Sequence, residues 1–352
     1  MENLLESTEK LKKGLSLPKI EAEEAAKILG YDSISDEEKI NFLKALAIKG
    51  ETAEEVSAFA SVFRNLAIDP DVSDFAKHGI DVCGTGGDGF GTFNISTTVS
   101  FILAAAGVPV LKHGNRSITS KCGSADLMEA IGIKLMVDLS VHRRALEALN
   151  FTFFFAPAFH PVFKAIMPAR KALASQGQKT IFNLLGPMIN PAQPSHQLMG
   201  VYSRSWVEPI AAAMDDLELK SGLIVHGVPQ LNSSLDELSC AGNNFFKGFG
   251  SLSDYQGELN LSDAGLDHCD PEDLKGGSVD ENLSMLFDFA NNDTSAIKKG
   301  LRDSIYLNAA AGLLSVAKVS TLNEGVLFGK KIVEEGELLN WLQQVKAFYS
   351  DI

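Results

Sequence analysis

Residues 81–97 read DVCGTGGDGFGTFNIST, and this stretch decides how the rest of the chain is interpreted. It contains five glycines and two acidic residues. Glycine at this density lets the backbone approach a ligand closely and adopt positive φ, which is how backbone N–H groups come to surround a phosphate. We therefore expect an anion-binding loop, with a tight turn that binds no ligand as the alternative.

Two familiar nucleotide-binding loops fit this stretch poorly. Gly84, Gly86 and Gly89 formally satisfy G-x-G-x-x-G, but that motif needs a helix directly after it and an acid about 20 residues further on. Here FGTFNIST intervenes, and the next acid after Asp88 is Asp126. A Walker loop needs Lys followed by Ser or Thr after its last glycine, and this pair is absent.

The length and the charge of the chain narrow the possible classes of protein. A chain of 352 residues exceeds what one hydrophobic core usually supports, so we expect two domains. The net charge of -14 and the pI near 5.0 argue against a general nucleic-acid-binding protein, which needs an excess of Lys and Arg.

The spacing of the cysteines and the lengths of the apolar runs indicate the cellular compartment. Four cysteines lie far apart without C-x-x-C spacing, which favours neither a disulfide framework nor a structural zinc site. The first residues, MENLLESTEKLKKG, are charged where a signal peptide is apolar, and no apolar run reaches about 18 residues. We therefore expect a soluble, cytoplasmic protein without a membrane partner.

The pattern of apolar residues changes near residue 72, from helical spacing to short apolar runs that alternate with helical segments. Residues 1–72 read as a small helical domain of about four short helices, two of which begin with capping boxes at Ser35/Glu38 and Thr52/Glu55. Residues 73–352 read as a larger α/β domain with a largely parallel central sheet, and part of 165–200 is expected to join the helical domain. The expected strands are IDVCG, VPVLKHG, FTFFFAP, HQLMGVY and GLIVHG, after a linker that contains Pro70.

The distribution of charge favours the anion-binding interpretation. No Asp or Glu occurs from Gly89 to Ala125, a window that contains Lys112, His113, Arg116 and Lys121. Two apolar helical runs begin inside this window, one after Asn94, Ser96 and Thr97 and one at Ser124. The N-terminus of a helix presents free N–H groups to an anion, so both turns are predicted to form one site at the carboxyl edge of the sheet. Taken singly, Asn94 is also a plausible helix cap, and Lys112 or Arg116 a solvated surface charge.

A series of motifs then resembles one enzyme family. GTGGD, NIST, KHGNR, GSADLMEAIG, FAPAFHP and TIFNLLGPMINPA occur in the order and spacing typical of anthranilate phosphoribosyltransferases, from about residue 79 to the end of the chain. GG...EN near 276–282 and LNAAAGLL fit the same pattern. The resemblance implies a homodimer with a nucleoside phosphorylase-like fold that acts on phosphoribosyl pyrophosphate (PRPP) and anthranilate with Mg²⁺, in tryptophan biosynthesis.

The resemblance also implies residue roles. The reaction needs no covalent nucleophile, so catalysis is expected to come from positioning and charge stabilisation. The implied PRPP site is Gly84, Gly87, Asp88, Thr92, Asn94, Ile95, Ser96, Thr97, Lys112, His113, Gly114, Asn115, Ser120 and Ser124. The implied anthranilate site is Gly84, His113, Asn115, His160 and Arg170, and the implied magnesium ligands are Ser96, Asp236 and Glu237.

Two departures from the family pattern leave other functions open. The segment after Arg170, KALASQGQK, is longer than usual and ends in Lys179 where Arg is typical, and the loop GVPQLNSSLD before Glu237 is expanded. A related phosphoribosyltransferase with another aromatic acceptor therefore remains an alternative. Further alternatives are a pyrimidine nucleoside phosphorylase and a non-catalytic relative that binds nucleic acid or a protein partner.

Overall fold

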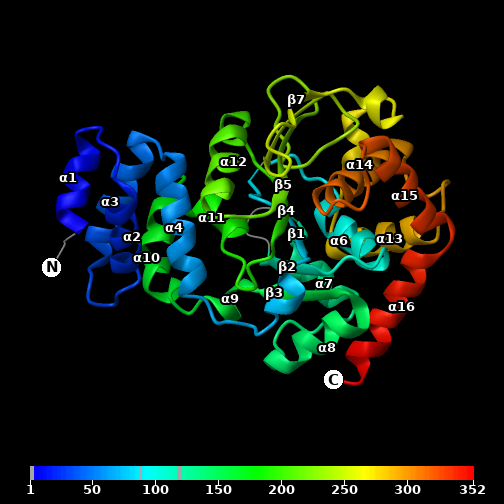
Figure 1. Ribbon diagram of the computed structural model, residues 1–352, viewed down its shortest axis with the longest axis horizontal. Coiled ribbons are helices and arrows are strands. Elements are labelled where there is room, and N and C mark those ends of the chain that lie inside the picture. Colours follow the sequence, from blue (N-terminus) through cyan, green and yellow to red (C-terminus); the bar gives the residue numbers. More distant parts are fainter. Residues whose placement is uncertain (1–3, 88, 117–120) are drawn as a thin grey trace.

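The computed structural model describes residues 4–87, 89–116 and 121–352. A bundle of N-terminal helices forms one end, a twisted sheet crosses the middle, and C-terminal helices cover the far side of the sheet (Figure 1). Asp88 and Ser120, both expected in the PRPP site, lie outside the described residues.

The N-terminal bundle confirms the predicted helices and their first turns. In both predicted capping boxes, the hydroxyl of Ser35 or Thr52 accepts the N–H of the glutamate three residues on, and that glutamate accepts the N–H of the cap. The four helices are α1 (Leu4–Lys12), α2 (Lys19–Leu29), α3 (Asp36–Lys49) and α4 (Ala53–Asn65).

The central sheet has seven strands in the order β3-β2-β1-β4-β5-β6-β7. The first five strands in the sequence pair in parallel, which confirms the predicted α/β domain. The antiparallel strands β6 and β7 were not predicted, because Asn, Lys and Gly interrupt their short apolar pattern. The strands are β1 (Ile80–Gly84), β2 (Val110–Gly114), β3 (Phe151–Phe155), β4 (His196–Gly200), β5 (Ser221–Val228), β6 (Asn243–Gly250) and β7 (Gln256–Leu259).

Helices cover both faces of the sheet, so neighbouring strand residues enter different cores. Leu198 joins the core on the side of the C-terminal helices, whereas Met199 joins the core shared with the N-terminal bundle. The remaining helices are α5 (Ser73–Ala76), α6 (Ile95–Ala105), α7 (Ser124–Ala130), α8 (Leu139–Leu149), α9 (Ala156–Phe159), α10 (Phe163–Ala174), α11 (Phe182–Met188), α12 (Val207–Asp216), α13 (Val279–Ala290), α14 (Lys299–Ser315), α15 (Leu322–Glu334) and α16 (Glu337–Ser350). Three 3-10 turns span Arg204–Trp206, Leu261–Ala264 and Pro271–Leu274.

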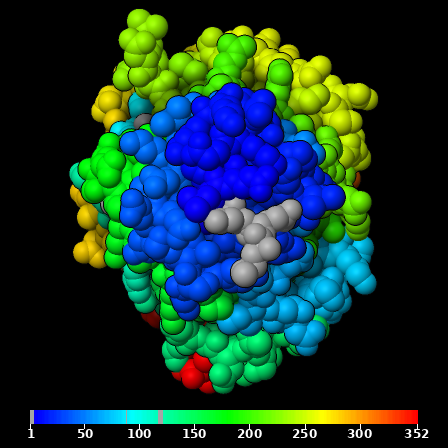
Figure 2. Space-filling view, turned by 90° about the vertical axis from the view of Figure 1, so that its left-hand side faces the viewer, coloured from blue at the N-terminus to red at the C-terminus, as the bar shows by residue number. Residues whose placement is uncertain are grey.

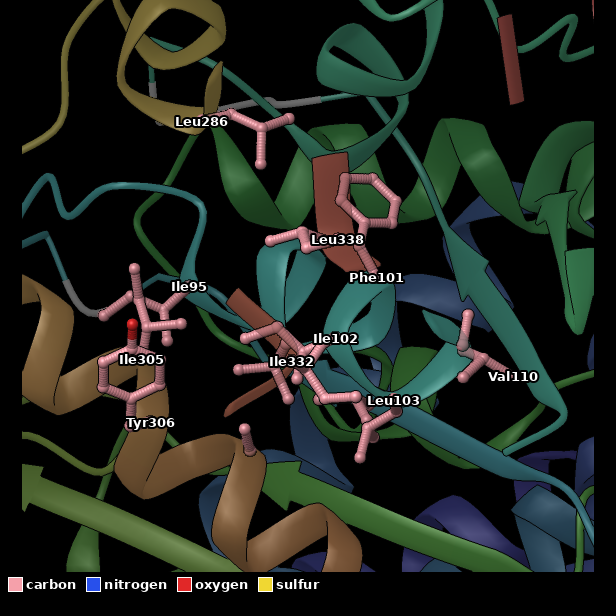
Figure 3. Packing of buried hydrophobic residues seen from close by; sticks show 14 of the residues in the cluster. Ile95, Phe101, Ile102, Leu103, Val110, Leu286, Ile305, Tyr306, Ile332 and Leu338 are labelled. Atoms are coloured by element: carbon pink, nitrogen blue, oxygen red, sulfur yellow. The ribbon is translucent and has the colours of Figure 1, made fainter. Parts of the chain in front are cut away.

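The larger core forms around α6, whose hydrophobic side chains face α14, α15 and α16 (Figure 3). Phe101 of α6 lies 5.1 Å from the ring of Trp341 and 5.5 Å from that of Phe151. The Trp341 indole N–H donates to the Leu149 carbonyl at 2.8 Å, so this buried polar group is satisfied. This packing fixes α6, and with it the helix N-terminus that follows the glycine-rich loop.

Two buried cations join the N-terminal bundle to the α/β domain. Lys39 of α3 donates to the Ala165 carbonyl of α10 at 2.7 Å, and Arg64 of α4 donates to the Met188 carbonyl at the end of α11. Burial lowers the pKa of Arg64 to about 10, and Asp81 partly opposes this effect. Figure 2 shows that N-terminal residues, coloured blue, cover most of this end of the molecule.

The expected linker is more ordered than its sequence indicates. It contains the short helix α5, and the Ile68 N–H donates to the Phe159 carbonyl at 2.9 Å, which ties the linker to α9. None of the helices in the described part of the chain is long and apolar enough to span a membrane.

The packing of His142 generates a prediction about stability. Its ring is buried between Phe154 and Phe159 and hydrogen-bonds to Thr152, and burial lowers its pKa to about 4. Because the unfolded state binds this proton at a pKa of about 6.5, the contribution to stability is complete above pH 6.5 and is lost as the pH falls toward 4. In His142→Gln the free energy of unfolding should fall less steeply as the pH decreases, by up to about 1.4 kcal/mol per pH unit.

Urea unfolding of wild type and His142→Gln between pH 4.5 and 7 measures this effect. His78→Gln is the matched control, because His78 is exposed. An unchanged pH dependence in His142→Gln would contradict the prediction.

Candidate functional site

The glycine-rich loop leaves the carboxyl end of β1 and leads into α6. Gly86, Gly87, Gly89 and Gly91 all have φ between +68° and +77°, a region that other residues rarely adopt. A side chain at Gly86 or Gly87 would enter open space, so the loop surface here is bare backbone. This confirms the positive-φ geometry that the glycine content predicts.

Asp236 lies directly on this loop. Its carboxylate accepts the Gly86 N–H at 2.6 Å. A Cβ on Gly84 would lie 2.1 Å from that carboxylate, and a Cβ on Gly200 would lie 1.5 Å from the Asp236 carbonyl oxygen. The ends of β1 and β4 therefore require glycine, because the loop that carries Asp236 and Glu237 (the acidic loop) lies directly against them.

Glu237 contacts the next part of the same site. Its carboxylate accepts the N–H of Ser96 at 3.1 Å, in the first turn of α6, where a negative charge is stabilised by the helix dipole. Asn94 precedes this turn, but its side chain does not cap the helix; it donates to the Cys122 carbonyl at 3.1 Å. The side chain of Ile95 is buried in the core, so only its backbone can face a ligand.

Several residues that the sequence analysis did not assign hold the glycine-rich loop. Lys275 donates to the Phe90 carbonyl at 2.8 Å, and Thr92 forms a bridge with Lys275. The buried Asn282 of α13 accepts the Asn94 N–H at 3.2 Å and donates to Gly277. The sequence signal for Asn282 was GG...EN, which the family resemblance included without giving that residue a role, and Lys275 directly precedes this motif.

The acidic loop has its own clamp. The buried Asn308 of α14 accepts the Leu238 N–H at 3.1 Å and donates to the Leu238 carbonyl at 2.7 Å. Ser304, one turn earlier, accepts the Cys240 N–H at 2.9 Å. These contacts fix the main chain directly after Asp236 and Glu237, and the sequence signal for Asn308 was LNAAAGLL.

A buried polar network lies beneath the loop. Asp81 accepts a hydrogen bond from Asn190 at 2.9 Å, and burial raises its pKa to about 6, while Lys112 and Asn190 oppose this shift. Lys112 is only 1% exposed, donates to the Val82 carbonyl, and has a pKa lowered by burial. Lys112 thus stabilises the end of β1 from below.

The turn after β2 brings Asn115 beside α7. Ser124 and the Ala125 N–H both donate to the Asn115 carbonyl at 3.3 Å. Gly114 is required here, since a Cβ would lie 2.4 Å from the Ser124 hydroxyl. Arg116, expected to contribute to a basic window, instead pairs with the acids that follow that window, Asp126 and Glu129.

His113 and His160 form a buried pair with ring centroids 5.1 Å apart. Burial lowers the pKa of His113 to about 3 and that of His160 to about 4, so both rings are neutral at pH 7. The Nε2 atom of His113 and both ring nitrogens of His160 have no hydrogen-bond partner of ordinary geometry in the described part of the chain. The pair therefore holds buried polar nitrogens that no such hydrogen bond of the described residues satisfies.

Arg170 of α10 is connected to this histidine pair through the ring of Phe163, and we call Arg170, His113 and His160 the acceptor wall. Its guanidinium is 5.0 Å from the ring centroid of Phe182 and 5.8 Å from that of Phe163, and Phe163 in turn contacts His160. Burial lowers the pKa of Arg170, and no acid of the described residues forms an ion pair with it. A flat aromatic carboxylate would find both a stacking surface and a charge partner here.

The possible metal ligands are sparse. Among residues 4–87, 89–116 and 121–352, no group of three or more His, Cys, Asp or Glu could hold a metal ion. Asp236 and Glu237 offer two carboxylates beside the first turn of α6, where Ser96 lies. The hydroxyl of Thr97 in the same turn is buried and has no hydrogen-bond partner within the described structure.

Comparison with known proteins assigns the chain. Residues 5–67 match the helical bundle domain of a glycosyl transferase family, and residues 76–339 match the a/b domain of that family. An anthranilate phosphoribosyltransferase of Petrotoga mobilis is 39% identical over 342 residues, covering 97% of this chain and 95% of the relative. The chain belongs to the anthranilate phosphoribosyltransferase family.

Solved structures of anthranilate phosphoribosyltransferases have the same fold. The enzyme of Thermus thermophilus superposes with a TM-score of 0.86 at 34% identity, covering 98% of this chain and 99% of that one. The Saccharomyces cerevisiae enzyme, solved in complex with PRPP and Mg, superposes with a TM-score of 0.84 at 25% identity, covering 99% and 98%. These matches confirm the predicted helical domain plus α/β domain.

The clamp on the acidic loop generates a prediction. Asn308→Ala would leave the buried N–H and C=O of Leu238 without partners, at about 1–3 kcal/mol for each group. We expect a stability loss of roughly 2–4 kcal/mol in urea unfolding and faster proteolysis near Leu238. Asn291→Ala is the matched control: the Asn308 amide donates to the helix carbonyl of Ser304 as well, and the Asn291 amide likewise donates to a helix carbonyl, that of Phe287, but is exposed. Equal, small losses in both variants would show that Asn308 does not clamp the loop.

Proposed function

We propose that this protein transfers the phosphoribosyl group of PRPP to anthranilate and releases pyrophosphate, in the biosynthesis of tryptophan. The observation that carries the proposal is the position of Asp236 and Glu237. Their carboxylates accept the Gly86 N–H and the Ser96 N–H, so two acids lie at the edge of the predicted anion site, beside the rest of the glycine-rich loop. Family membership supports the same conclusion.

The donor site would be the bare backbone of the glycine-rich loop together with the N-terminus of α6. Gly86 and Gly87 can approach pyrophosphate without steric hindrance, and the helix dipole favours its charge. We assign Gly84, Thr92, Asn94, Ser96, Asn115 and Ser124 to the same site, with Asp88 and Ser120 proposed from sequence alone. Lys112 would act mainly by its charge and by stabilising β1, since its ammonium is engaged with Val82.

The geometry of the acidic pair fits Mg²⁺. Two carboxylates beside the anion-binding amides would repel pyrophosphate unless a cation lay between them. Mg²⁺ binds through one or two carboxylates and takes its remaining ligands from phosphates and water, which suits a site with only Asp236, Glu237 and the Ser96 hydroxyl. When bound, the ion would neutralise the charge that develops on the leaving pyrophosphate.

The acceptor site would be the wall formed by Arg170, His113 and His160. Arg170 would pair with the carboxylate of anthranilate while Phe163 and Phe182 hold the guanidinium in place. The two histidines remain neutral and so would not compete with Arg170 for the carboxylate. Their ring nitrogens would accept or donate a hydrogen bond near the amine.

These groups suit a reaction without a covalent intermediate. As the bond between the ribose C1 and pyrophosphate breaks, negative charge grows on the leaving group beside the loop amides, and the amine attacks the sugar from the acceptor side. Preorganised N–H dipoles stabilise that charge, and the acceptor wall orients the amine.

The direct test is turnover. Purified protein mixed with anthranilate, PRPP and Mg²⁺ should consume anthranilate, measured as a loss of its fluorescence, and should release pyrophosphate. Uridine with inorganic phosphate tests the pyrimidine nucleoside phosphorylase alternative, and a panel of other aromatic amines tests for a different acceptor. Binding of PRPP without turnover on any amine would indicate a non-catalytic relative.

The proposal also covers the oligomeric state, the bounds of the helical domain and the cellular location. We propose a homodimer in which the N-terminal helices take part, supported by the exposed apolar side chains of Leu5, Leu15, Ile20 and Ile48 on this bundle. The helical domain would span 1–72 and include part of 165–200, supported by the contact of Lys39 with Ala165. A cytoplasmic location is consistent with four free cysteines.

The magnesium proposal predicts the effect of neutralising both acids. Asp236→Asn with Glu237→Gln keeps the size of both side chains but removes the charges that would hold the metal. Turnover should fall steeply and recover only in part with excess Mg²⁺, as measured in a magnesium titration of the initial rate. Glu258→Gln, at an exposed position of β7, controls for a general loss of charge. Normal turnover of the double variant at low Mg²⁺ would contradict the assignment.

The acceptor proposal predicts a selective effect of Arg170→Ala. The variant should raise the KM for anthranilate about 10- to 150-fold, from a loss of roughly 1.5–3 kcal/mol for a charge-assisted contact, and leave the KM for PRPP unchanged. Aniline lacks the carboxylate, so any reaction with aniline should proceed equally in both proteins. Equal losses for both substrates would make Arg170 structural, and no effect would place it outside the site.

A further inference from the structure

The segment after Arg170 is a regular helix end. Gly177, with φ of +71°, donates to the Ala174 carbonyl, and Gln178 donates to the Leu173 carbonyl at 3.0 Å. This is the hydrogen-bond pattern of a Schellman motif, which ends α10 and reverses the chain. The lengthened sequence therefore gives Lys179 a defined position, directly after the reversal.

Lys179 lies over an aromatic ring and has no acidic partner. Its ammonium is 3.5 Å from the ring centroid of Tyr202, well within the range of a cation–π contact. No carboxylate of the described residues forms an ion pair with it. Burial lowers the pKa of Lys179, which is the effect expected for a cation drawn against an apolar surface.

Tyr202 connects this contact to the glycine-rich loop. It stands two residues after the end of β4, and its N–H donates to the hydroxyl of Thr85 at 3.0 Å. The Thr85 N–H donates to the Gly200 carbonyl, also at 3.0 Å. Thr85 is the first residue after β1, so these two bonds set the direction in which the glycine-rich loop leaves the sheet.

The Tyr202 ring is held on its other side as well. It packs against the core that the N-terminal bundle shares with the sheet. Burial raises the pKa of its phenol, and Trp206 and Glu51 are close enough to influence that pKa. Of these neighbours, Lys179 is the one that comes from the segment carrying Arg170.

We infer that Lys179 and Tyr202 are positioning residues for the donor site: Lys179 holds the Tyr202 ring, and Tyr202 holds Thr85 and thereby the start of the pyrophosphate loop. The inference rests on the proposed function, and assigns to Lys179 a role on the PRPP side although it follows the acceptor residue Arg170. Removing the ammonium should loosen Thr85 and weaken PRPP binding without affecting anthranilate.

Calorimetric titration of the protein with PRPP in the presence of Mg²⁺ tests whether Lys179 and Tyr202 support PRPP binding in this way. Lys179→Met should weaken PRPP binding about two- to fivefold, the effect of one partly exposed cation–π contact. Lys179→Arg keeps the cation and should retain wild-type affinity, and Tyr202→Phe keeps the ring and should do the same. Lys171→Met is the matched control, because Lys171 is an exposed lysine of α10.

A double variant separates action through Tyr202 from a direct contact with substrate. Tyr202→Leu removes the ring, so adding Lys179→Met to it should produce no further loss of affinity. Circular dichroism and thermal unfolding check that Tyr202→Leu is folded; if it is not, the comparison of Lys179→Met with Lys179→Arg decides alone.

Four outcomes would overturn the inference: unchanged PRPP affinity in Lys179→Met, failure of Lys179→Arg to retain affinity, additive losses in the double variant, or a raised KM for anthranilate. Failure of the wild-type protein to bind PRPP would instead overturn the proposed function, so the two failures are distinguishable. A selective loss of PRPP affinity is not expected from a general structural role, which would affect both substrates and the thermal transition.

Discussion

Asp236 crosses the ends of β1 and β4 so closely that only hydrogen fits beneath it, since its carboxylate lies against Gly84 and its main chain against Gly200. Any side chain at Gly84 or Gly200 would overlap the carboxylate or the carbonyl of Asp236. This steric constraint sets the height of the acidic loop above the sheet. Because of it, Asp236 meets the Gly86 N–H and its neighbour Glu237 meets the N-terminus of α6. The donor half of the candidate site is organised around that crossing.

Buried polar groups fix the strands and loops around the crossing. Asp81 and Lys112 lie inside the sheet with Asn190, and each has at least one hydrogen bond of its own. Polar groups at such depth are expensive unless they are satisfied, and a satisfied network holds its surroundings in one arrangement. Asn308 of α14 and Asn282 of α13 hold the two loops in the same way. The acceptor wall instead depends on α10, which packs against the N-terminal bundle, so separate contacts set the two halves of the site.

The local features of the fold could be read from the sequence. The capping boxes at Ser35 and Thr52, the five parallel strands and the positive φ of the glycines were all predicted, because each depends on residues that are neighbours in the chain. The strands β6 and β7 were missed because they are antiparallel additions: β6 pairs with β5 and β7 pairs with β6, and this pairing rather than their own pattern stabilises them. The family resemblance supplied the acidic pair, which composition alone would have left as a surface loop.

The sequence by itself determined the fold class, the family and the chemical type of the loop, since these follow from local patterns and ordered motifs. Only the tertiary structure decided where charged side chains point. Lys112 and Arg116 both belong to a window without acids, yet Lys112 turns beneath β1 toward Val82, and Arg116 pairs with Asp126 and Glu129 beyond the window. The direction in which a charged side chain points depends on desolvation and on partners that folding brings together from other elements. The spacing of residues along the chain therefore does not specify it.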